Sequence, residues 1–281
     1  MQLRSGMAAW VTGAGSGIGR GLTLELAARG LNVAAADIRI EAAAETVDLV
    51  RGAGGQAAAF EVDVSDGSAV EAAAREAEAK IGPVSLVCSN AGVAMHGIPI
   101  HEIDAADWDW VIGVNIYGVI HGIRSFLPGM LESGKPGHFL HSASIGGFQV
   151  NPAFLTTAYS MTKYAVVALS EGFQNELEGT KIGVSVLAPA AVATEIHLSA
   201  RSRPQRHGGA GVREANHFLG DLIRDGSDPR EIAATALAAI ENDRFYIFPH
   251  DETREWLQRR HEKIMHDFAP ERPDSKKDAA E

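Results

Sequence analysis

A tyrosine and a lysine four residues apart, Tyr159 and Lys163, are the two residues of this 281-residue chain whose types and spacing most directly suggest chemistry. In a helix this spacing places both side chains on one face, about one turn apart. A phenol normally loses its proton near pH ~10, and a neighbouring ammonium lowers that pKa because it favours the phenolate. Such a tyrosine could take a proton from an alcohol or return it to a ketone. Since the same spacing also arises by chance in surface helices, its meaning depends on the rest of the chain.

A glycine-rich turn near the N-terminus supports a catalytic interpretation. The apolar run 7–12 leads into the sequence TGAGSGIG at 12–19, and a helical pattern of leucines follows. Glycines at a strand-to-helix turn let the backbone approach a pyrophosphate, and the helix N-terminus favours its negative charge. An ordinary glycine loop is the alternative, but both flanks fit the dinucleotide-binding pattern. The residues expected to contact the cofactor here are Gly13, Ser16, Gly17, Ile18 and Gly19.

Two acidic residues follow the next strand-like runs. Asp37 ends the run 31–36, about 20 positions beyond the glycines, where a carboxylate accepts hydrogen bonds from the adenosine ribose and repels a 2′-phosphate. This favours NAD over NADP. Arg39 could instead pair with a phosphate, or it could simply be a solvated residue at the start of the next helix. Asp63, after the run 56–62, is placed either to bind the adenine edge or to cap the following helix.

Polar residues also follow the later strand-like runs. Asn90-Ala91-Gly92 comes after the run 84–88, and Ser142-Ala143-Ser144 closes the run 138–142. The carboxyl ends of parallel strands are where ligands bind in doubly wound sheets, so we expect these residues to lie at one site. A sixth run, 182–187, leads to Pro189.

A long helical stretch is predicted over 104–127, ending at Pro128. Asn115 lies in its middle and needs hydrogen-bond partners there, as either a structural or a catalytic residue. Three glycines in the stretch would let another backbone pack closely: Gly113, Gly118 and Gly122.

The alternation of strand-like and helical runs predicts an α/β fold, a doubly wound parallel sheet of the Rossmann type in three layers. We see no linker, and expect one domain over 1–281 with a flexible tail at 270–281. The net charge of −11 argues against nucleic-acid binding. No signal peptide and no apolar run of transmembrane length is evident, so we expect no membrane association and a cytoplasmic location. The single cysteine, Cys88, is expected to be buried, and the histidines show no metal-binding spacing.

Taken together, these residues resemble a short-chain dehydrogenase/reductase of the single-domain Rossmann type, over about residues 7–250. The chain departs from the family pattern at Ser89, where Asn is common, and at Ala190, where Gly commonly follows the proline. The motifs that carry the resemblance are Thr12-Gly13, Gly17-Ile18-Gly19, Asp63, Asn90-Ala91-Gly92, Asn115, Ser144, Tyr159 with Lys163, and Pro189 with Thr194.

The resemblance implies a catalytic tetrad. Tyr159 would be the acid/base, Lys163 would bind the nicotinamide ribose and lower the tyrosine pKa, and Asn115 would hold a water in the proton relay. Ser144 would bind the substrate oxygen, and it is preferred to Ser142 because Ser144-Ile145-Gly146-Gly147 matches the family pattern, although its separation from Tyr159 is slightly long. Implied NAD contacts beyond the glycine turn are Asp37, Asp63, Val64, Asn90, Ala91, Gly92, Tyr159, Lys163, Pro189, Val192 and Thr194.

The resemblance also implies a substrate lid over about 195–228 and a homo-oligomer, a tetramer or dimer, paired through helices 104–127 and 157–178. The lid contains a basic cluster that either meets an anionic substrate or is a solvated mobile loop: Arg201, Arg203, Arg206 and His207. The pairing helices carry apolar residues beyond the needs of one core face: Trp108, Trp110, Val111, Val166, Val167 and Leu169. Four hydrophobic residues are expected either in the pocket wall or in the core: Phe148, Val150, Phe154 and Leu155.

The leading interpretation is an NAD-dependent oxidoreductase that acts on a small-molecule secondary alcohol or ketone. The stretches 109–122 and 241–249 are similar to a branch of the family that includes dehydrogenases of bulky aromatic alcohols. The alternatives are an NADPH-preferring carbonyl reductase, which Asp37 disfavours, and a catalytically inactive dinucleotide sensor, which has no need for Tyr159 and Lys163 together.

Overall fold

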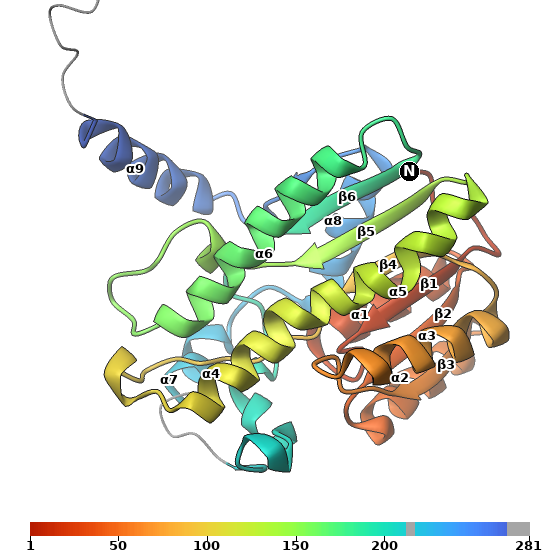
Figure 1. Cartoon of the computed structure of the whole chain (residues 1–281), viewed down its shortest axis with the longest axis horizontal. Helices are drawn as coiled ribbons and strands as arrows, with labels where there is room; N and C mark the ends of the chain where they lie inside the picture. The colour runs from red at the N-terminus through yellow and green to blue at the C-terminus, as the bar shows by residue number, and fades with distance from the viewer. Residues whose placement is uncertain (212–216, 269–281) are drawn as a thin grey trace, which may run out of the picture.

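The computed structural model of the chain describes residues 1–211 and 217–268, so the predicted tail at 270–281 lies outside the described residues. In this part of the chain, seven parallel strands form one sheet in the order β3-β2-β1-β4-β5-β6-β7 (Figure 1). The strand order reverses between β1 and β4, which opens a crevice at their carboxyl ends. The strands are β1 (Ala8–Thr12), β2 (Asn32–Asp37), β3 (Gln56–Glu61), β4 (Val84–Ser89), β5 (Gly137–Ser142), β6 (Ile182–Leu187) and β7 (Tyr246–Ile247).

Helices cover both faces of the sheet, as the predicted fold class requires. One face packs against α1 (Gly17–Ala28), α2 (Ile40–Gly52) and α8 (Pro229–Glu241). The other packs against α3 (Gly67–Ile81), α5 (Gly118–Ser133) and α6 (Thr157–Glu176), which lie in front of the sheet in Figure 1. Because both faces are covered, the strands are apolar almost throughout. The three-layer doubly wound prediction is therefore confirmed.

The long helical stretch runs further than predicted. It comprises α4 (Ala105–Ile112), a π-helical turn at Gly113–Tyr117 and then α5, with Pro128 inside the last helix. The predicted end at Pro128 is wrong. A proline removes one hydrogen bond from a helix, but Met130 is buried in the core just beyond it and holds the last turn in place. The helix ends before Gly134, whose left-handed backbone (φ 59°) stops it.

The three glycines of this stretch permit close packing, but of side chains and not of another backbone as predicted. A Cβ added at Gly118 would lie 2.9 Å from a Val64 side-chain carbon, and one at Gly122 would lie 3.0 Å from the Ser89 hydroxyl. We expected no apolar run of transmembrane length, and this expectation is wrong: Ala105–Ser133 is long enough and apolar enough to span a membrane, judged by length and composition alone. That run is instead a helix laid on the sheet, and its residues Phe126 and Met130 belong to the core.

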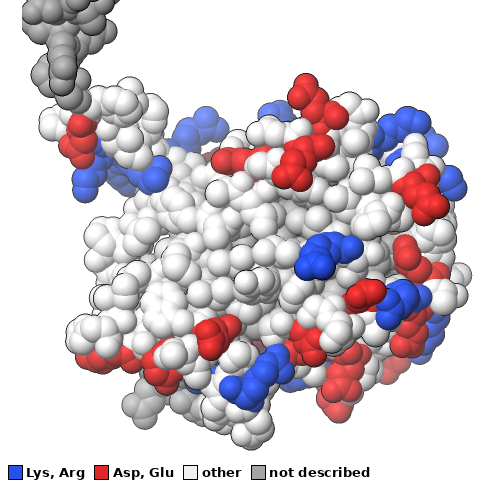
Figure 2. Space-filling model, viewed as in Figure 1, with Lys and Arg blue, Asp and Glu red and all other residues white. Residues whose placement is uncertain are grey.

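The residues from which subunit pairing was inferred are mostly core residues. Within a single chain Trp110, Val111, Val166 and Val167 are buried, so they do not support an interface. Figure 2 nevertheless shows few charged side chains across the middle of the face formed by α5 and α6. The exposed apolar residues on this helical layer are Tyr117, Leu131 and Met161.

The remaining elements were not predicted as such. Between β6 and α8 the chain forms short 3₁₀ turns at Ile196–Ser202 and Gln205–His207, and then α7 (His217–Ile223). The C-terminal helix α9 (Thr253–His266) projects from the body (Figure 1). Two further 3₁₀ turns, Ile100–Glu102 and Ile145–Gly147, lie in the loops after β4 and β5.

Candidate active site

A cavity of about 570 Å³ opens at the carboxyl ends of the strands, within the usual size range of small-molecule and cofactor sites. Of the residues predicted to bind the cofactor or to act in catalysis, all except Gly19 and Asn115 line it. Because these residues come from seven separate segments, only the parallel sheet brings them together.

Tyr159 and Lys163 lie one turn apart near the start of α6 and face this cavity. The Lys163 side chain is almost fully buried, with its Nζ 5.6 Å from the centre of the Tyr159 ring. The same Nζ donates a 2.8 Å hydrogen bond to the backbone carbonyl of Ser142, at the end of β5. The ammonium group is thus held between the helix and the sheet, on the cavity side of the tyrosine.

Burial acts on both ionisable groups and disfavours the charged form of each. It raises the pKa of Tyr159 to about 12, although a hydrogen bond from Ser144 lowers it in part. It lowers the pKa of Lys163 to about 8. Without ligands, Lys163 therefore loses its proton before Tyr159 does. The expectation that the ammonium lowers the tyrosine pKa applies only while Lys163 remains protonated.

The two candidate serines have different partners. Ser144 hydrogen-bonds the Tyr159 side chain and also accepts the backbone N–H of Gly146 at 3.1 Å. The Ser142 hydroxyl instead donates to Asn90 Oδ1 at 3.1 Å. Asn90 in turn donates from Nδ2 to the Thr12 carbonyl at 3.0 Å, which links the ends of β1, β4 and β5. Ser144 is thus the serine placed beside the tyrosine, while Ser142 and Asn90 brace the strand ends.

Asn115 lies in the π-helical turn, a feature often found at functional sites. Its Oδ1 accepts from the Val93 backbone N–H at 2.8 Å, and its Nδ2 donates to the Val93 carbonyl and to Thr162 Oγ1. The amide therefore joins the loop after β4 to α6 behind Lys163. Its oxygen accepts one hydrogen bond and keeps one lone pair, but Asn115 is buried and does not line the cavity, so its relay role remains what the family resemblance implies.

The glycine turn fits a dinucleotide. Gly13 and Gly17 have left-handed backbones, with φ 66° and 51°. A Cβ at Gly19 would lie 2.1 Å from the Gly13 carbonyl oxygen, so a glycine is needed here for the turn to pack against the start of α1. Gly19 does not itself line the cavity. Ser16 caps α1 without using its side chain, which leaves the first N–H groups of the helix directed at the cavity. The cradle has the shape and polarity that a pyrophosphate requires.

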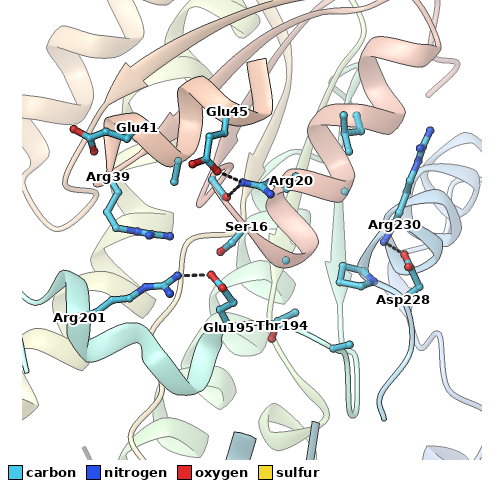
Figure 3. Close-up of a pocket in the computed structure, with 17 residues that line it drawn as sticks. Ser16, Arg20, Arg39, Glu41, Glu45, Thr194, Glu195, Arg201, Asp228 and Arg230 are labelled. Atoms are coloured by element: carbon cyan, nitrogen blue, oxygen red, sulfur yellow. Dashed lines mark hydrogen bonds and ion pairs between the residues drawn. The ribbon is translucent and has the colours of Figure 1, made fainter. Parts of the chain in front are cut away.

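Asp37, at the end of β2, is hydrogen-bonded to this turn. Its carboxylate accepts the backbone N–H groups of Gly15 and Arg39, both at 2.9 Å. A second hollow adjoins the glycine turn, and in Figure 3 Arg39 and Arg201 extend toward the space beside Ser16. Acidic residues also line this hollow, and Glu195 pairs with Arg201.

The arginines of the predicted lid are attached to the body of the protein. Arg203 forms a 2.7 Å ion pair with Asp107 on α4, with both side chains mostly buried, and its guanidinium lies over the Trp110 ring. Arg206 pairs with Asp63. The interpretation of this cluster as a solvated loop is therefore wrong for Arg203. Asp63 also accepts the Ser65 N–H at 3.0 Å, whereas the N-cap of α3 is Asp66.

The loop after β6 forms another part of the cavity wall. The Pro189 carbonyl accepts the Ile145 N–H at 2.9 Å, and Thr194 packs against Gly17. Ala190, the departure from the family pattern, donates its N–H to Nδ1 of the buried His250 at 3.2 Å. The sequence analysis missed His250, whose other nitrogen lies 3.0 Å from the Ser227 hydroxyl and fixes the loop against the start of α8.

The substrate end of the cavity is largely apolar. Phe154 lies in its wall, while Phe148 packs against Tyr246 and Phe248. The other apolar lining residues include Leu219, Leu222, Ile223 and Trp256. His96 also lines this end and was missed by the sequence analysis, although its position four residues after Gly92, in a strand-end loop, was a usable signal. The described residues contain no cluster of three metal-ligand side chains.

Comparisons with known proteins agree with this geometry. The family pattern described as short chain dehydrogenase matches residues 7–205. A C alpha-dehydrogenase from Sphingobium sp. (strain NBRC 103272 / SYK-6) is 36% identical over 266 residues, which cover 93% of this chain and 86% of that protein. A 1-deoxy-11-beta-hydroxypentalenate dehydrogenase from Streptomyces avermitilis is 31% identical over 245 residues, covering 87% and 84%.

Solved structures show the same likeness. The crystal structure of a short chain dehydrogenase/reductase from Burkholderia phymatum in complex with NAD superposes with a TM-score of 0.90 at 35% identity. The match covers 97% of this chain and 99% of that one.

Proposed function

The chain belongs to the short-chain dehydrogenase/reductase family of oxidoreductases, and we propose that it transfers a hydride between NAD(H) and a secondary alcohol or ketone. The observation that carries this proposal is the convergence of Tyr159, Ser144 and Lys163 on the cavity that also contains the glycine cradle. A proton-transfer group and a dinucleotide site in one cavity are what alcohol oxidation requires.

NAD, when bound, supplies the hydride acceptor, and its reduced form supplies the hydride donor for the reverse reaction. The glycine turn would hold the pyrophosphate, and Asp37 the adenosine ribose. Ser144 holds the substrate oxygen beside the Tyr159 hydroxyl. Tyr159 then takes the proton from this oxygen in oxidation and returns it in reduction. Lys163, while protonated, stabilises the phenolate, and Asn115 keeps the loop after β4 in place and holds the relay water.

The substrate is proposed to be bulky and apolar, with an aromatic or polycyclic group next to the carbinol carbon. The apolar lining around Phe154 and Trp256 supports this, because a small alcohol would leave most of that surface in water. One relative is named as the dehydrogenase of a hydroxypentalenate, a substrate that carries a hydroxyl group, which is consistent with alcohol oxidation.

Asp37 supports NAD as the preferred cofactor, whereas Arg39 and Arg201 favour the second candidate, an NADPH-preferring reductase, because they extend toward the same region. We rank NAD first, since the Asp37 carboxylate would face the 2′-phosphate of NADP. An inactive sensor remains the third interpretation, and turnover by the purified protein would exclude it. A homotetramer or dimer and a cytoplasmic location stay predictions from the sequence.

The test is a panel of secondary alcohols offered with NAD and with NADP, followed at the nicotinamide absorbance. The matched control is Tyr159→Phe, which removes one hydroxyl and should abolish turnover while NADH binding, read by fluorescence, stays nearly unchanged. A Tyr159→Phe enzyme that kept more than about a tenth of the wild-type kcat would remove this residue from the acid/base role, since general acid–base catalysis contributes at least about a hundredfold.

A further inference from the structure

His96 lies beside the proposed proton-transfer group but plays no part in the mechanism above. Its imidazole packs on the Tyr159 ring, with centroids 4.8 Å apart and planes at 41°, and it lines the cavity. The loop that carries it is fixed on both sides. The Ala94 N–H donates to Ser199 Oγ at 3.1 Å, and the Gly97 N–H donates to the Leu155 carbonyl at 2.8 Å. The ring is therefore held against the Tyr159 ring by a loop whose backbone is hydrogen-bonded on both sides of His96.

The two ring nitrogens of His96 have different surroundings. Nδ1 is fully buried and has no hydrogen-bond partner among the described residues. Nε2 is not buried in this way, so it is the nitrogen open to the cavity. Among backbone groups, a buried N–H without an acceptor is rarer than an under-satisfied acceptor, and we apply the same preference to the two ring nitrogens. On this ground we assign the proton of His96 to Nε2, so that the ring presents an N–H donor to the cavity.

The ring is also neutral, because burial lowers the pKa of His96 to about 4. A neutral donor suits an uncharged acceptor oxygen, such as an ether or a hydroxyl. Once a bulky substrate has displaced water from the apolar end of the cavity, an Nε2–H without an acceptor would be an unsatisfied polar group. A substrate that supplies the acceptor avoids this penalty.

We propose that His96 is a positioning residue whose Nε2–H binds a second oxygen of the substrate, beside the oxygen held by Tyr159 and Ser144. The preferred substrates are then secondary alcohols or ketones with an oxygen acceptor within two or three bonds of the reacting carbon. This inference rests on the proposed function and names its substrate class. The specificity comes from a site built to hydrogen-bond, which rejects analogues that lack the oxygen.

The test compares two alcohols of nearly the same shape, 2-methoxy-1-phenylethanol and 1-phenylbutan-1-ol, in which one ether oxygen replaces one methylene. The wild type should prefer the ether by about tenfold or more in kcat/KM, mainly through KM. His96→Leu keeps the volume of the side chain without a donor, and this preference should fall to near unity. His96→Gln restores an N–H close to the Nε2 position and should recover most of it, whereas His96→Asn, which mimics Nδ1, should not.

The matched control is His101→Leu in the same loop, because His101 is largely exposed and does not line the cavity. Its substrate preference should equal that of the wild type. Thermal unfolding of each variant separates a folding defect from a change in preference. A wild type that oxidises both alcohols equally, or a His96→Leu variant that keeps the full preference, overturns the inference alone. Recovery by Asn but not by Gln overturns the assignment of the donor to Nε2. A wild type that oxidises no secondary alcohol refutes the proposed function and this inference with it.

Discussion

Replacing Lys163 by Met tests how the charge of the lysine assists the tyrosine. In the protein without ligands, the pKa of Lys163 is about 8 and that of Tyr159 about 12, because burial disfavours both charged forms. The first proton lost by the pair is therefore the lysine proton. The catalytically useful form, phenolate beside ammonium, carries the same number of protons as neutral tyrosine beside neutral lysine. The two groups titrate as a coupled pair.

The size of the effect follows from the distance between them. With Nζ 5.6 Å from the ring centre, one ammonium stabilises the phenolate by about 3 kcal/mol at an effective dielectric constant of ~20, or about two pKa units. Beside charged Lys163, the pKa of Tyr159 is then about 10, two units above the Lys163 pKa of about 8. Of the molecules that have lost one proton from the pair, about 1% therefore carry the useful form, phenolate beside ammonium. At pH 8 half of the molecules are in that state. In the Met variant the phenolate fraction at pH 8 is about 10⁻⁴, so kcat/KM for oxidation should fall by roughly fifty- to a hundredfold.

The assay is the pH profile of kcat/KM for alcohol oxidation. The wild-type rate should rise with pH and level off near pH 8, where the pair has lost its first proton. The Met variant should rise without a break up to about pH 10, since only the tyrosine titration remains. Lys135→Met is the control, because Lys135 is exposed in the turn before β5, at the opposite end of that strand from the site, and its profile should match that of the wild type.

Stability provides an independent check. Below pH 8, Lys163 is protonated in both the folded and the unfolded protein, and the folded protein then bears the full free-energy cost of burying the charge. Its removal should raise the free energy of unfolding at pH 7 by up to roughly 3 kcal/mol, less the loss of the hydrogen bond to the Ser142 carbonyl. A Met variant whose rate falls less than fivefold, or whose profile still levels off near pH 8, would refute this account of the pair.

Four further outcomes are expected. Asp37→Ala should weaken the binding of NAD more than that of NADP. If the ratio of kcat/KM with NAD to kcat/KM with NADP is unchanged, Asp37 does not bind the ribose. Of the lid predicted over 195–228, residues 212–216 lie outside the described part of the chain; amides of 195–211 and 217–228 should exchange faster in the free protein than with cofactor and ketone bound, whereas sheet-like protection in the free protein would mean a fixed wall. Sedimentation should show an oligomer at micromolar concentration, and a monomer alone would count against the face of α5 and α6, with its few charged side chains, as an interface. Burial lowers the pKa of folded His141 to about 3, whereas the unfolded chain takes up this proton below about pH 6.5, so the wild type loses free energy of unfolding as the pH falls between these values. Between pH 6.5 and 4, the free energy of unfolding of His141→Phe should therefore fall by roughly 3 kcal/mol less than that of the wild type, as measured by denaturant titration.

Local pattern was sufficient to predict the fold class and six of the seven strands, but not β7 (Tyr246–Ile247). Strand-like runs that are apolar along their whole length require helices on both faces, and alternation with helical runs requires parallel crossovers. The glycine turn could be recognised because its backbone conformation, as at Gly13 and Gly17, is a property of the residues themselves. Tyr159 and Lys163 could be paired for a similar reason, since helical geometry alone sets their spacing.

Contacts between distant segments decided the rest, and no local pattern encodes them. The order of the two pKa values depends on how deeply the sheet and the loop after β4 bury Lys163. Pro128 remains inside a helix because the next turn packs into the core, and this packing outweighs the low helix propensity of proline. Arg203 was expected in solvent because an arginine in a polar loop usually is solvated, but its partner Asp107 lies almost a hundred residues earlier in the chain. His96 likewise has an ordinary sequence context. It becomes a candidate substrate contact only because folding places its ring on Tyr159 and buries one of its two nitrogens.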